Sequence, residues 1–133
     1  MNPIQKIVDS HAIKALFTVK LVEQGDGKIT LRFKAREDSI HGHQGVTGLM
    51  IDCAARAAGY SSLGQSFLSE CETSIQPSPH AREFIAYTNI TWADNQCATF
   101  YCDIYSLHRT AKTLVAESQG TLSKAKPALA RVA

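Results

Sequence analysis

Apolar side chains occupy every second position in two early stretches of the chain, 17–21 and 29–33, with polar side chains between them. This period of two is typical of a β-strand that buries one face. The residues between the stretches, 24–27, are Gln-Gly-Asp-Gly, and both glycines can adopt the positive φ values of a tight turn. The pattern therefore predicts a β-hairpin over about 15–35.

The residues before this hairpin carry a shorter pattern. Ile4, Ile7 and Val8 would share one face of a helix, and Pro3 suits its first turn. We expect residues 1–12 to form a short helix or an irregular N-terminal arm.

The spacing of apolar residues becomes helical in the middle of the chain. A loop without apolar periodicity, 36–45, leads into a helix that is predicted to run from residue 45 to about 60. Gly59 and Gly64 are candidate ends of this helix. Its apolar face consists of Val46, Leu49, Met50, Cys53, Ala54, Ala57 and Ala58. The opposite side carries Gly48, Asp52, Arg56 and Gly59. Because that side is only partly polar and has small residues, we expect a helix that is buried nearly all round.

Strand patterns dominate the second half of the chain. β-Branched and aromatic residues are frequent in most of the four segments predicted as strands: 71–76, 84–92, 98–107 and 113–122. Pro77 and Pro79 end the first of these strands. The last ten residues, 124–133, have no such pattern and are expected to form a tail.

The predicted order of elements is two strands, one long helix and about four further strands. A single apolar helix can be covered only if an antiparallel sheet curves around it. We therefore predict an α+β fold in which a curved antiparallel sheet of five to six strands wraps one long central helix, as a single domain over 1–133. Such a sheet leaves faces and edges to bury, which predicts a homodimer or a dimer of dimers.

The composition is that of an ordinary soluble globular protein, with 44% hydrophobic and 20% charged residues. A net charge of +2 is too small to predict a nucleic-acid partner but is compatible with an anionic small molecule. No apolar run approaches the roughly 20 residues that cross a bilayer, and the N-terminus lacks the pattern of a signal peptide. We expect a cytoplasmic protein without a membrane partner.

The four cysteines, at 53, 71, 97 and 102, form no C-x-x-C pair. We expect reduced, mostly buried thiols. Zinc would need a cluster of ligands that these spacings do not supply, and His41, His43 and Asp52 together also leave ligands unaccounted for. The sequence therefore predicts neither a metal nor an organic cofactor.

The most informative segment runs from His41 to Asp52, where a polar, glycine-bearing loop enters the predicted helix. Backbone N–H groups in a first helical turn have no partner within the helix, and the helix dipole attracts anions to them. A thioester carbonyl placed there would have its developing oxyanion stabilised. Asp52 lies two turns further along, where a carboxylate is rare unless it is paired or used. It could attack a thioester carbon or take a proton from an attacking water.

A family resemblance is carried by the segment His43-Gln44-Gly45-Val46-x-x-Leu49-x-x-Asp52-x-Ala54-x-x-Ala57. It resembles the signature of the hotdog-fold acyl-CoA thioesterases of the phenylacetate-degradation (PaaI-like) type, including the interval of nine residues from histidine to carboxylate. The Gly-Asp-Gly hairpin and the stretch 114–121 also resemble that family. The resemblance implies the hotdog fold and hydrolysis of an acyl-CoA or acyl-carrier-protein thioester.

The resemblance also implies roles for individual residues. Asp52 would be the nucleophile or general base, in a site shared by two subunits across a dimer interface. The backbone N–H of Gln44 or Gly45 would form the oxyanion hole, and His43 would shape the loop near the thioester.

Three positions depart from the family's pattern. Gln44 replaces the first glycine of its pair, and Glu37 stands where the family often has Gln or Asn. Arg56 stands one turn after Asp52, where many members have Ser or Thr. It can pair with Asp52 at i, i+4 and favour the ionised carboxylate, or it can hold an acidic acyl group or a phosphate. Glu37 and Arg56 are therefore candidate substrate-binding residues, and the sequence leaves the role of Arg56 open.

Further cations, Arg82, Arg109 and Lys112, lie at predicted strand ends. They could meet the nucleotide phosphates of CoA, or they could be solvated surface charges.

Two other functions fit the same fold. One is a 3-hydroxyacyl-thioester dehydratase or enoyl hydratase, which needs a histidine base and a carboxylic acid facing one substrate. The other is a non-catalytic acyl-CoA-binding module.

Overall fold

The computed structural model describes residues 3–36, 44–76 and 81–126 of the chain. Its helices are α1 (Pro3–Val8), α2 (His11–Leu16) and α3 (Gln44–Leu63). Its strands are β1 (Phe17–Gly25), β2 (Lys28–Ala35), β3 (Ser66–Ile75), β4 (Glu83–Ala93), β5 (Cys97–His108) and β6 (Ala111–Lys124). The predicted order of two strands, one long helix and four strands is confirmed.

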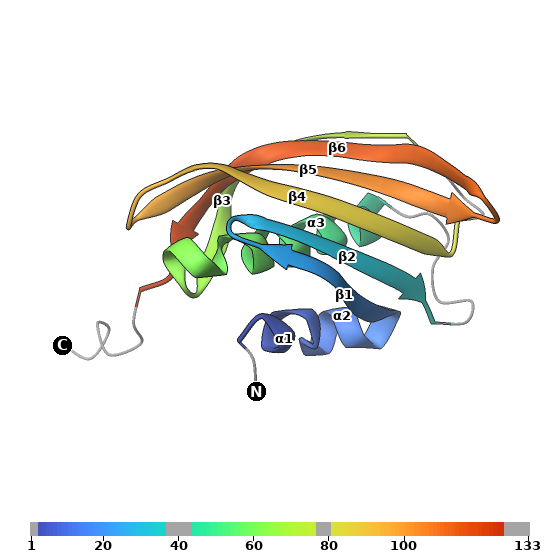
Figure 1. The fold of residues 1–133 in the computed structure, drawn as a ribbon, viewed down its shortest axis with the longest axis horizontal. Coiled ribbons are helices and arrows are strands. Elements are labelled where there is room, and N and C mark those ends of the chain that lie inside the picture. Colours follow the sequence, from blue (N-terminus) through green and yellow to red (C-terminus); the bar gives the residue numbers. More distant parts are fainter. Residues whose placement is uncertain (1–2, 37–43, 77–80, 127–133) are drawn as a thin grey trace.

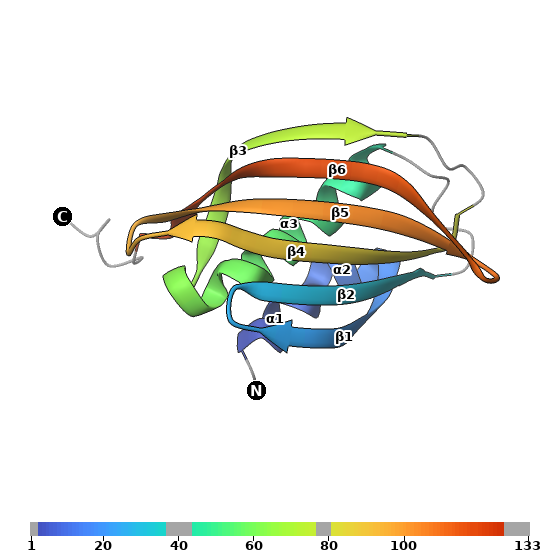
Figure 2. The same ribbon diagram turned by 45° about the horizontal axis from the view of Figure 1, so that its top comes forward.

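The six strands form one antiparallel sheet in the order β1-β2-β4-β5-β6-β3. The sheet curves, and α3 lies against its concave side (Figure 1). α1 and α2 cover another side of α3, so that α3 is packed between the sheet and the N-terminal helices. Figure 2 shows the strands side by side over α3, with β1 and β3 at the two edges. The predicted curved sheet around one long helix is therefore confirmed.

The first hairpin forms as the alternating pattern predicts. Ile29, Leu31 and Phe33 of β2 are buried, while the polar residues between them face outward or are partly covered. Of the two glycines at the turn, Gly27 has a positive φ of 70°, and Gly25 lies within β1. A glycine is needed at position 27 because other residues rarely adopt this conformation.

The N-terminal residues form two helices where the sequence predicted at most one. α1 confirms the short helix that the spacing of Ile4 and Val8 indicates, and both side chains are buried. α2 was not predicted, because its six residues offer only Ile13 as a buried side chain and so carry no helical period. β1 begins directly after α2, at Phe17.

α3 is slightly longer than predicted, over Gln44–Leu63. Gly64 follows it with a φ of 68°, the left-handed conformation that commonly ends a helix. The alternative end, Gly59, was wrong. A Cβ at Gly59 would lie 2.7 Å from Cδ1 of Leu122, so the glycine lets α3 approach β6 closely within the helix.

α3 is buried on more than one side because two layers cover it. Cys53, Ala54 and Ala55 are all fully buried, although successive residues of a helix point in directions about 100° apart. Their small side chains allow neighbouring elements to pack closely. Accessible residues recur about once per turn along α3 and form a row, which we call the accessible stripe. It consists of Gly48, Leu49, Asp52, Arg56 and Tyr60.

β3 extends further toward the N-terminus than the predicted strand 71–76, because it begins at Ser66. Most of its side chains are exposed, and in its first half Phe67 is exposed while Ser66 is partly buried, so the residue types show no apolar alternation. A bulge between Leu68 and Glu70 interrupts its pairing with β6. Gly120 of β6 lies opposite this bulge, where a Cβ would collide with the backbone carbonyl oxygen of Glu70.

Candidate active site on the central helix

The entry to the site is the first turn of α3, which begins at Gln44. Gln44 and Gly45 therefore occupy the turn whose N–H groups have no acceptor within the helix, as the sequence predicted. The side chains of these two residues lie outside the described part of the chain. So do His43 and Glu37, and their predicted roles remain predictions.

Asp52 forms an ion pair with Arg56 one turn further along α3. Nε of Arg56 donates to Oδ2 of Asp52 at 3.0 Å. The Asp52 side chain is 37% exposed and the Arg56 side chain is 26% exposed. The ion pair that the i, i+4 spacing predicts is thus present, and it holds the Asp52 carboxylate at the accessible stripe.

The residues on either side of Asp52 in the sequence are apolar and buried. Ile51 and Cys53, its neighbours in sequence, are almost completely buried. Burial raises the pKa of the Cys53 thiol to about 12, an effect that the charge of Arg56 opposes and those of Asp52 and Asp9 reinforce. The thiol is therefore protonated at neutral pH and is no competing nucleophile. The Asp52 carboxylate is the accessible nucleophilic group on this part of α3.

The distance between Asp52 and the start of α3 limits what one chain can do. Asp52 lies eight residues after Gln44, which corresponds to about 12 Å along a helix that rises 1.5 Å per residue. A thioester carbonyl in hydrogen-bond contact with a first-turn N–H would thus lie too far from Asp52 of the same chain for direct attack.

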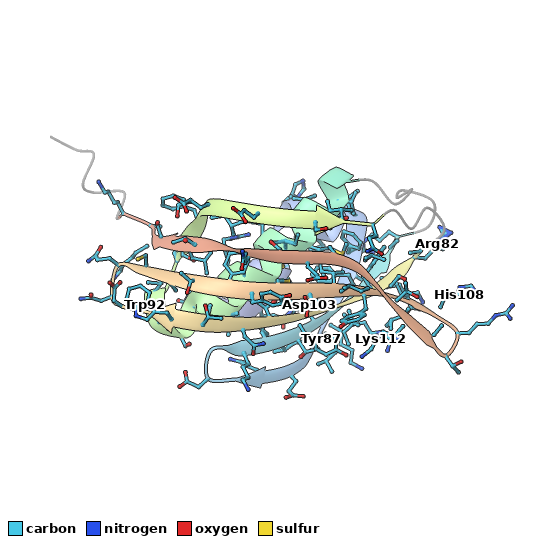
Figure 3. The ribbon with its side chains drawn as sticks, turned by 90° about the horizontal axis from the view of Figure 1, so that it is seen from above. Arg82, Tyr87, Trp92, Asp103, His108 and Lys112 are labelled. Carbon is cyan, nitrogen blue, oxygen red and sulfur yellow. The ribbon has the colours of Figure 1, made fainter. Side chains whose placement is uncertain are left out.

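Two of the predicted phosphate-binding cations lie at one end of the sheet. Glu83 pairs with Leu107, so that Arg82 and His108 come next to one another at the ends of β4 and β5 (Figure 3). Arg109 follows in the β5–β6 turn and is exposed. β2 ends at the same end of the sheet, since Lys34 pairs with Glu83. The N–H of Ala35, the last residue of β2, donates to the carbonyl oxygen of Arg82 at 2.8 Å, so β2 ends beside Arg82.

Lys112 differs from these arginines in its surroundings. Its Nζ lies 4.7 Å from the centre of the Tyr87 ring and donates to Oη of Tyr87 at 2.7 Å. It also lies 5.1 Å from the centre of the Tyr105 ring. Figure 3 shows Lys112 and Tyr87 together on the outer face of the sheet. We therefore assign Lys112 to that outer face and not to the site on α3.

A groove lies between α1, the second half of α3 and the start of β3, with a volume of about 390 Å³. We call it the α1–α3 groove. Its polar lining consists of Lys6, Ser10, Arg56, Tyr60, Gln65 and Ser66. Of these only Arg56 was singled out from the sequence. Tyr60 follows Arg56 at i+4 and could have been found from that spacing, whereas nothing local links Lys6 to α3.

Within residues 3–36, 44–76 and 81–126, no group of three or more His, Cys, Asp or Glu side chains is placed to hold a metal ion. The four cysteines are all free thiols. Cys53 and Cys102 are buried, but Cys71 is exposed, so the prediction of mostly buried thiols is wrong for Cys71. In the same part of the chain, no helix has the length and apolar character required to span a bilayer.

No protein-family model matches the sequence, and no curated protein matches it. Solved structures do match its fold. A thioesterase family protein from Silicibacter pomeroyi superposes with a TM-score of 0.77 at 14% identity, covering 92% of this chain and 97% of that one. The PaaI protein from the phenylacetic acid degradation operon of Escherichia coli superposes with a TM-score of 0.77 at 16% identity, covering 92% and 90%.

A third similar structure is a hypothetical thioesterase protein with coenzyme A from Streptococcus pneumoniae. It superposes with a TM-score of 0.68 at 11% identity, covering 81% of this chain and 89% of that one. Similarity at these identities shows the fold. The chain has the hotdog fold, as the resemblance of its central segment implied.

Proposed function

We propose that this protein hydrolyses the thioester of an acyl-CoA, with Asp52 as the catalytic carboxylate. The observation that carries the proposal is the position of Asp52. It is a half-exposed carboxylate on the accessible stripe of an otherwise buried helix, whose first turn offers unpaired N–H groups. Structures named as thioesterases share this fold, and one of them is described with coenzyme A.

The chemistry needs only the groups that α3 supplies. Asp52 takes a proton from water while the water oxygen attacks the thioester carbon, or its own oxygen attacks first and water later releases the acyl group. In both routes the carbonyl oxygen becomes an oxyanion that a first-turn N–H stabilises. The C–S bond then breaks, and the thiolate of CoA is protonated. The products are a carboxylic acid and free CoA thiol.

The two catalytic groups come from different subunits in this proposal. The separation of about 10 to 12 Å along one helix prevents one chain from providing both Asp52 and the N–H of Gln44 or Gly45 to the same carbonyl. Two antiparallel copies of α3 would bring the Asp52 of one subunit beside the first turn of the other, and would do so twice by symmetry. The proposed site is therefore a property of a homodimer.

The edge strand β3 is the surface that we assign to this dimer. Its outer edge pairs with no strand among the described residues, and Phe67 on it is 51% exposed. An unpaired strand edge readily adds a strand from another chain. α3 packs against β3, so a partner joined at this edge would lie beside α3.

The arginines at the end of the sheet have the charge required to bind the nucleotide part of CoA. Arg82 lies beside the end of β2, and Arg109 lies in the turn between β5 and β6 at the same end of the sheet. Guanidinium groups bind phosphate oxygens with charge-assisted hydrogen bonds. We propose that these two arginines bind the nucleotide phosphates of CoA.

The primary test measures the release of free thiol from aliphatic and aromatic acyl-CoAs. The parent protein should release thiol from at least one of them, and Asp52→Asn should reduce the rate by at least about a hundredfold. Glu23→Gln removes an exposed carboxylate from β1 and serves as the matched control. A protein that releases no thiol from any ester, or an Asp52→Asn variant as active as the parent, would overturn the proposal.

The shared site has its own test. Gly45→Pro removes one first-turn N–H, and proline is well tolerated at the start of a helix. Gly45→Pro and Asp52→Asn should each be inactive alone. If they are unfolded and refolded together, half the dimers are mixed and one of their two sites is complete. About a quarter of the parent activity should return. No recovery in verified mixed dimers would show that each chain works by itself.

The same assays separate the other functions that the fold allows. A dehydratase or hydratase would change the absorbance of an enoyl-CoA without releasing thiol. A non-catalytic module would be stabilised by CoA esters against heat and would show no turnover.

A further inference from the structure

We propose that the α1–α3 groove binds the carboxylate of the substrate's acyl group, so that the preferred substrates are thioesters of dicarboxylic acids. This inference rests on the proposed thioesterase activity and assigns its substrate class. The groove is separate from the first turn of α3 and from the arginines at the end of the sheet, so it is a further part of the substrate path.

The lining of the groove has the chemistry of an oxyanion site. Two cationic residues, Lys6 and Arg56, line it from different helices, and none of the described residues that line it carries a carboxylate. Ser10 and Tyr60 add hydroxyl groups, and Gln65 adds an amide. Cations together with neutral donors bind a carboxylate by several charge-assisted hydrogen bonds.

Arg56 connects this groove to the proposed catalytic carboxylate. Its Nε donates to Oδ2 of Asp52 at 3.0 Å, and Arg56 is one of the residues that line the groove. A guanidinium presents five N–H donors in a planar fork, so the donors that Asp52 does not use can serve a second carboxylate. The Asp52 side chain thus orients Arg56 toward a ligand in the groove.

The groove lies close enough to Asp52 for the acyl chain of one substrate to reach both. Arg56 lies four residues after Asp52, or about 6 Å along the helix, and Tyr60 lies about 12 Å from Asp52. An acyl chain with a few methylene groups spans this range. Pro3, Ile7 and Ala125 provide apolar surface in the same groove for such methylene groups.

The position of Lys6 favours a carboxylate-binding site at Arg56 over a purely structural ion pair. The pairing of Arg56 with Asp52 would need no second cation, yet Lys6 of α1 lines the same groove from the other side. Lys6 is exposed and forms no salt bridge with a described residue. Its ammonium group can therefore turn toward a ligand without breaking a described ion pair.

The test compares dicarboxylic with monocarboxylic esters of equal length, adipoyl-CoA with hexanoyl-CoA and suberoyl-CoA with octanoyl-CoA. The parent should have a kcat/KM at least about tenfold higher for the dicarboxylic member of one pair. Lys6→Gln should lower this ratio about tenfold, and Lys6→Glu should reverse the preference. Lys14→Gln, which changes an exposed lysine of α2, should keep the parental ratio.

Each result has a defined meaning. Hydrolysis with equal kcat/KM values within every pair, or a ratio that Lys6→Gln does not change, would overturn the assignment of the groove and leave the thioesterase intact. Release of no thiol from any ester would instead overturn the proposed function. A second arm adds free adipate or inorganic phosphate to the hydrolysis of hexanoyl-CoA. If either ligand alters this rate through Lys6 while dicarboxylic esters have no advantage, the groove binds a free effector and the acyl assignment is wrong.

Discussion

Arg56 donates from Nε to Oδ2 of Asp52 at 3.0 Å, and this ion pair is the only one on α3 among the described residues. The pair is partly exposed, so its direct contribution to folding stability is small. Its importance lies in orientation, because a carboxylate on an accessible stripe has several rotamers and the guanidinium selects one of them. We therefore regard Arg56 as a positioning residue.

Replacing Arg56 should reduce turnover through the geometry of Asp52. Arg56→Gln should lower kcat on a monocarboxylic acyl-CoA by about tenfold to a hundredfold, with a smaller change in KM. Arg56→Lys keeps the charge without the planar fork and should lie between Arg56→Gln and the parent. Steady-state kinetics on folded variants, checked by circular dichroism, make the comparison. A higher kcat in Arg56→Gln would show that the ion pair restrains Asp52 instead of positioning it.

Charging the exposed edge of β3 should weaken the dimer. Phe67→Lys places a cation on this edge, where natural sheets use lysine to oppose strand addition. Light scattering after gel filtration should show a larger monomer fraction, and thiol release should fall with it. Trp92→Lys is the matched control, because Trp92 is 54% exposed on β4, away from this edge. Equal dissociation of both variants would argue against β3 as the interface.

Gly120 should be intolerant of substitution, because the bulge in β3 brings another backbone against it. A Cβ at this position would meet the carbonyl oxygen of Glu70 and would also lie 3.0 Å from Cα of Cys71. Neither backbone atom can turn away, so Gly120→Ala should cost at least about 2 kcal/mol of unfolding free energy. Urea denaturation measures this. Gly25→Ala, where an added Cβ would make only an ordinary contact of 4.0 Å with Cβ of Lys28, should change stability by less than about 1 kcal/mol.

The four thiols should separate into two classes. Cys71 is exposed and Cys97 is half-buried, so both should react with a thiol reagent in the folded protein. Cys53 and Cys102 are buried, and burial raises the pKa of each thiol to about 12. Both should react only after unfolding. Rapid modification of all four in the native protein would contradict this burial.

These pKa values also predict how stability depends on pH. The buried thiols hold their protons to about pH 12 in the folded state, whereas in the unfolded state they ionise near the ordinary value of 9.0. Their contribution is complete below pH 9 and is lost as pH rises toward 12, because the unfolded state then releases protons that the folded state retains. Cys102→Ala should flatten this decline in urea denaturation series above pH 9. An unchanged slope would exclude Cys102 as its source.

The sequence by itself determined the elements with regular local patterns. Alternation predicted the β1–β2 hairpin and the strands β4 to β6, and helical spacing predicted α3, because one buried face leaves its period in the chain. The pairing of Asp52 with Arg56 was also readable, since residues four apart on a helix are neighbours whatever surrounds them. The hotdog fold followed from the order of these elements and from the segment that runs into α3.

Only the tertiary structure decided which part of α3 stays accessible and what lies beside it. α2 and the first half of β3 were missed, because short or exposed elements carry no period. Lys6 and Arg56 line the same α1–α3 groove, and Gly120 lies against the backbone of Glu70 on the neighbouring strand. Such contacts join residues about fifty apart in the chain. They depend on how α1 and β3 pack against the rest of the fold, and no local spacing encodes that packing.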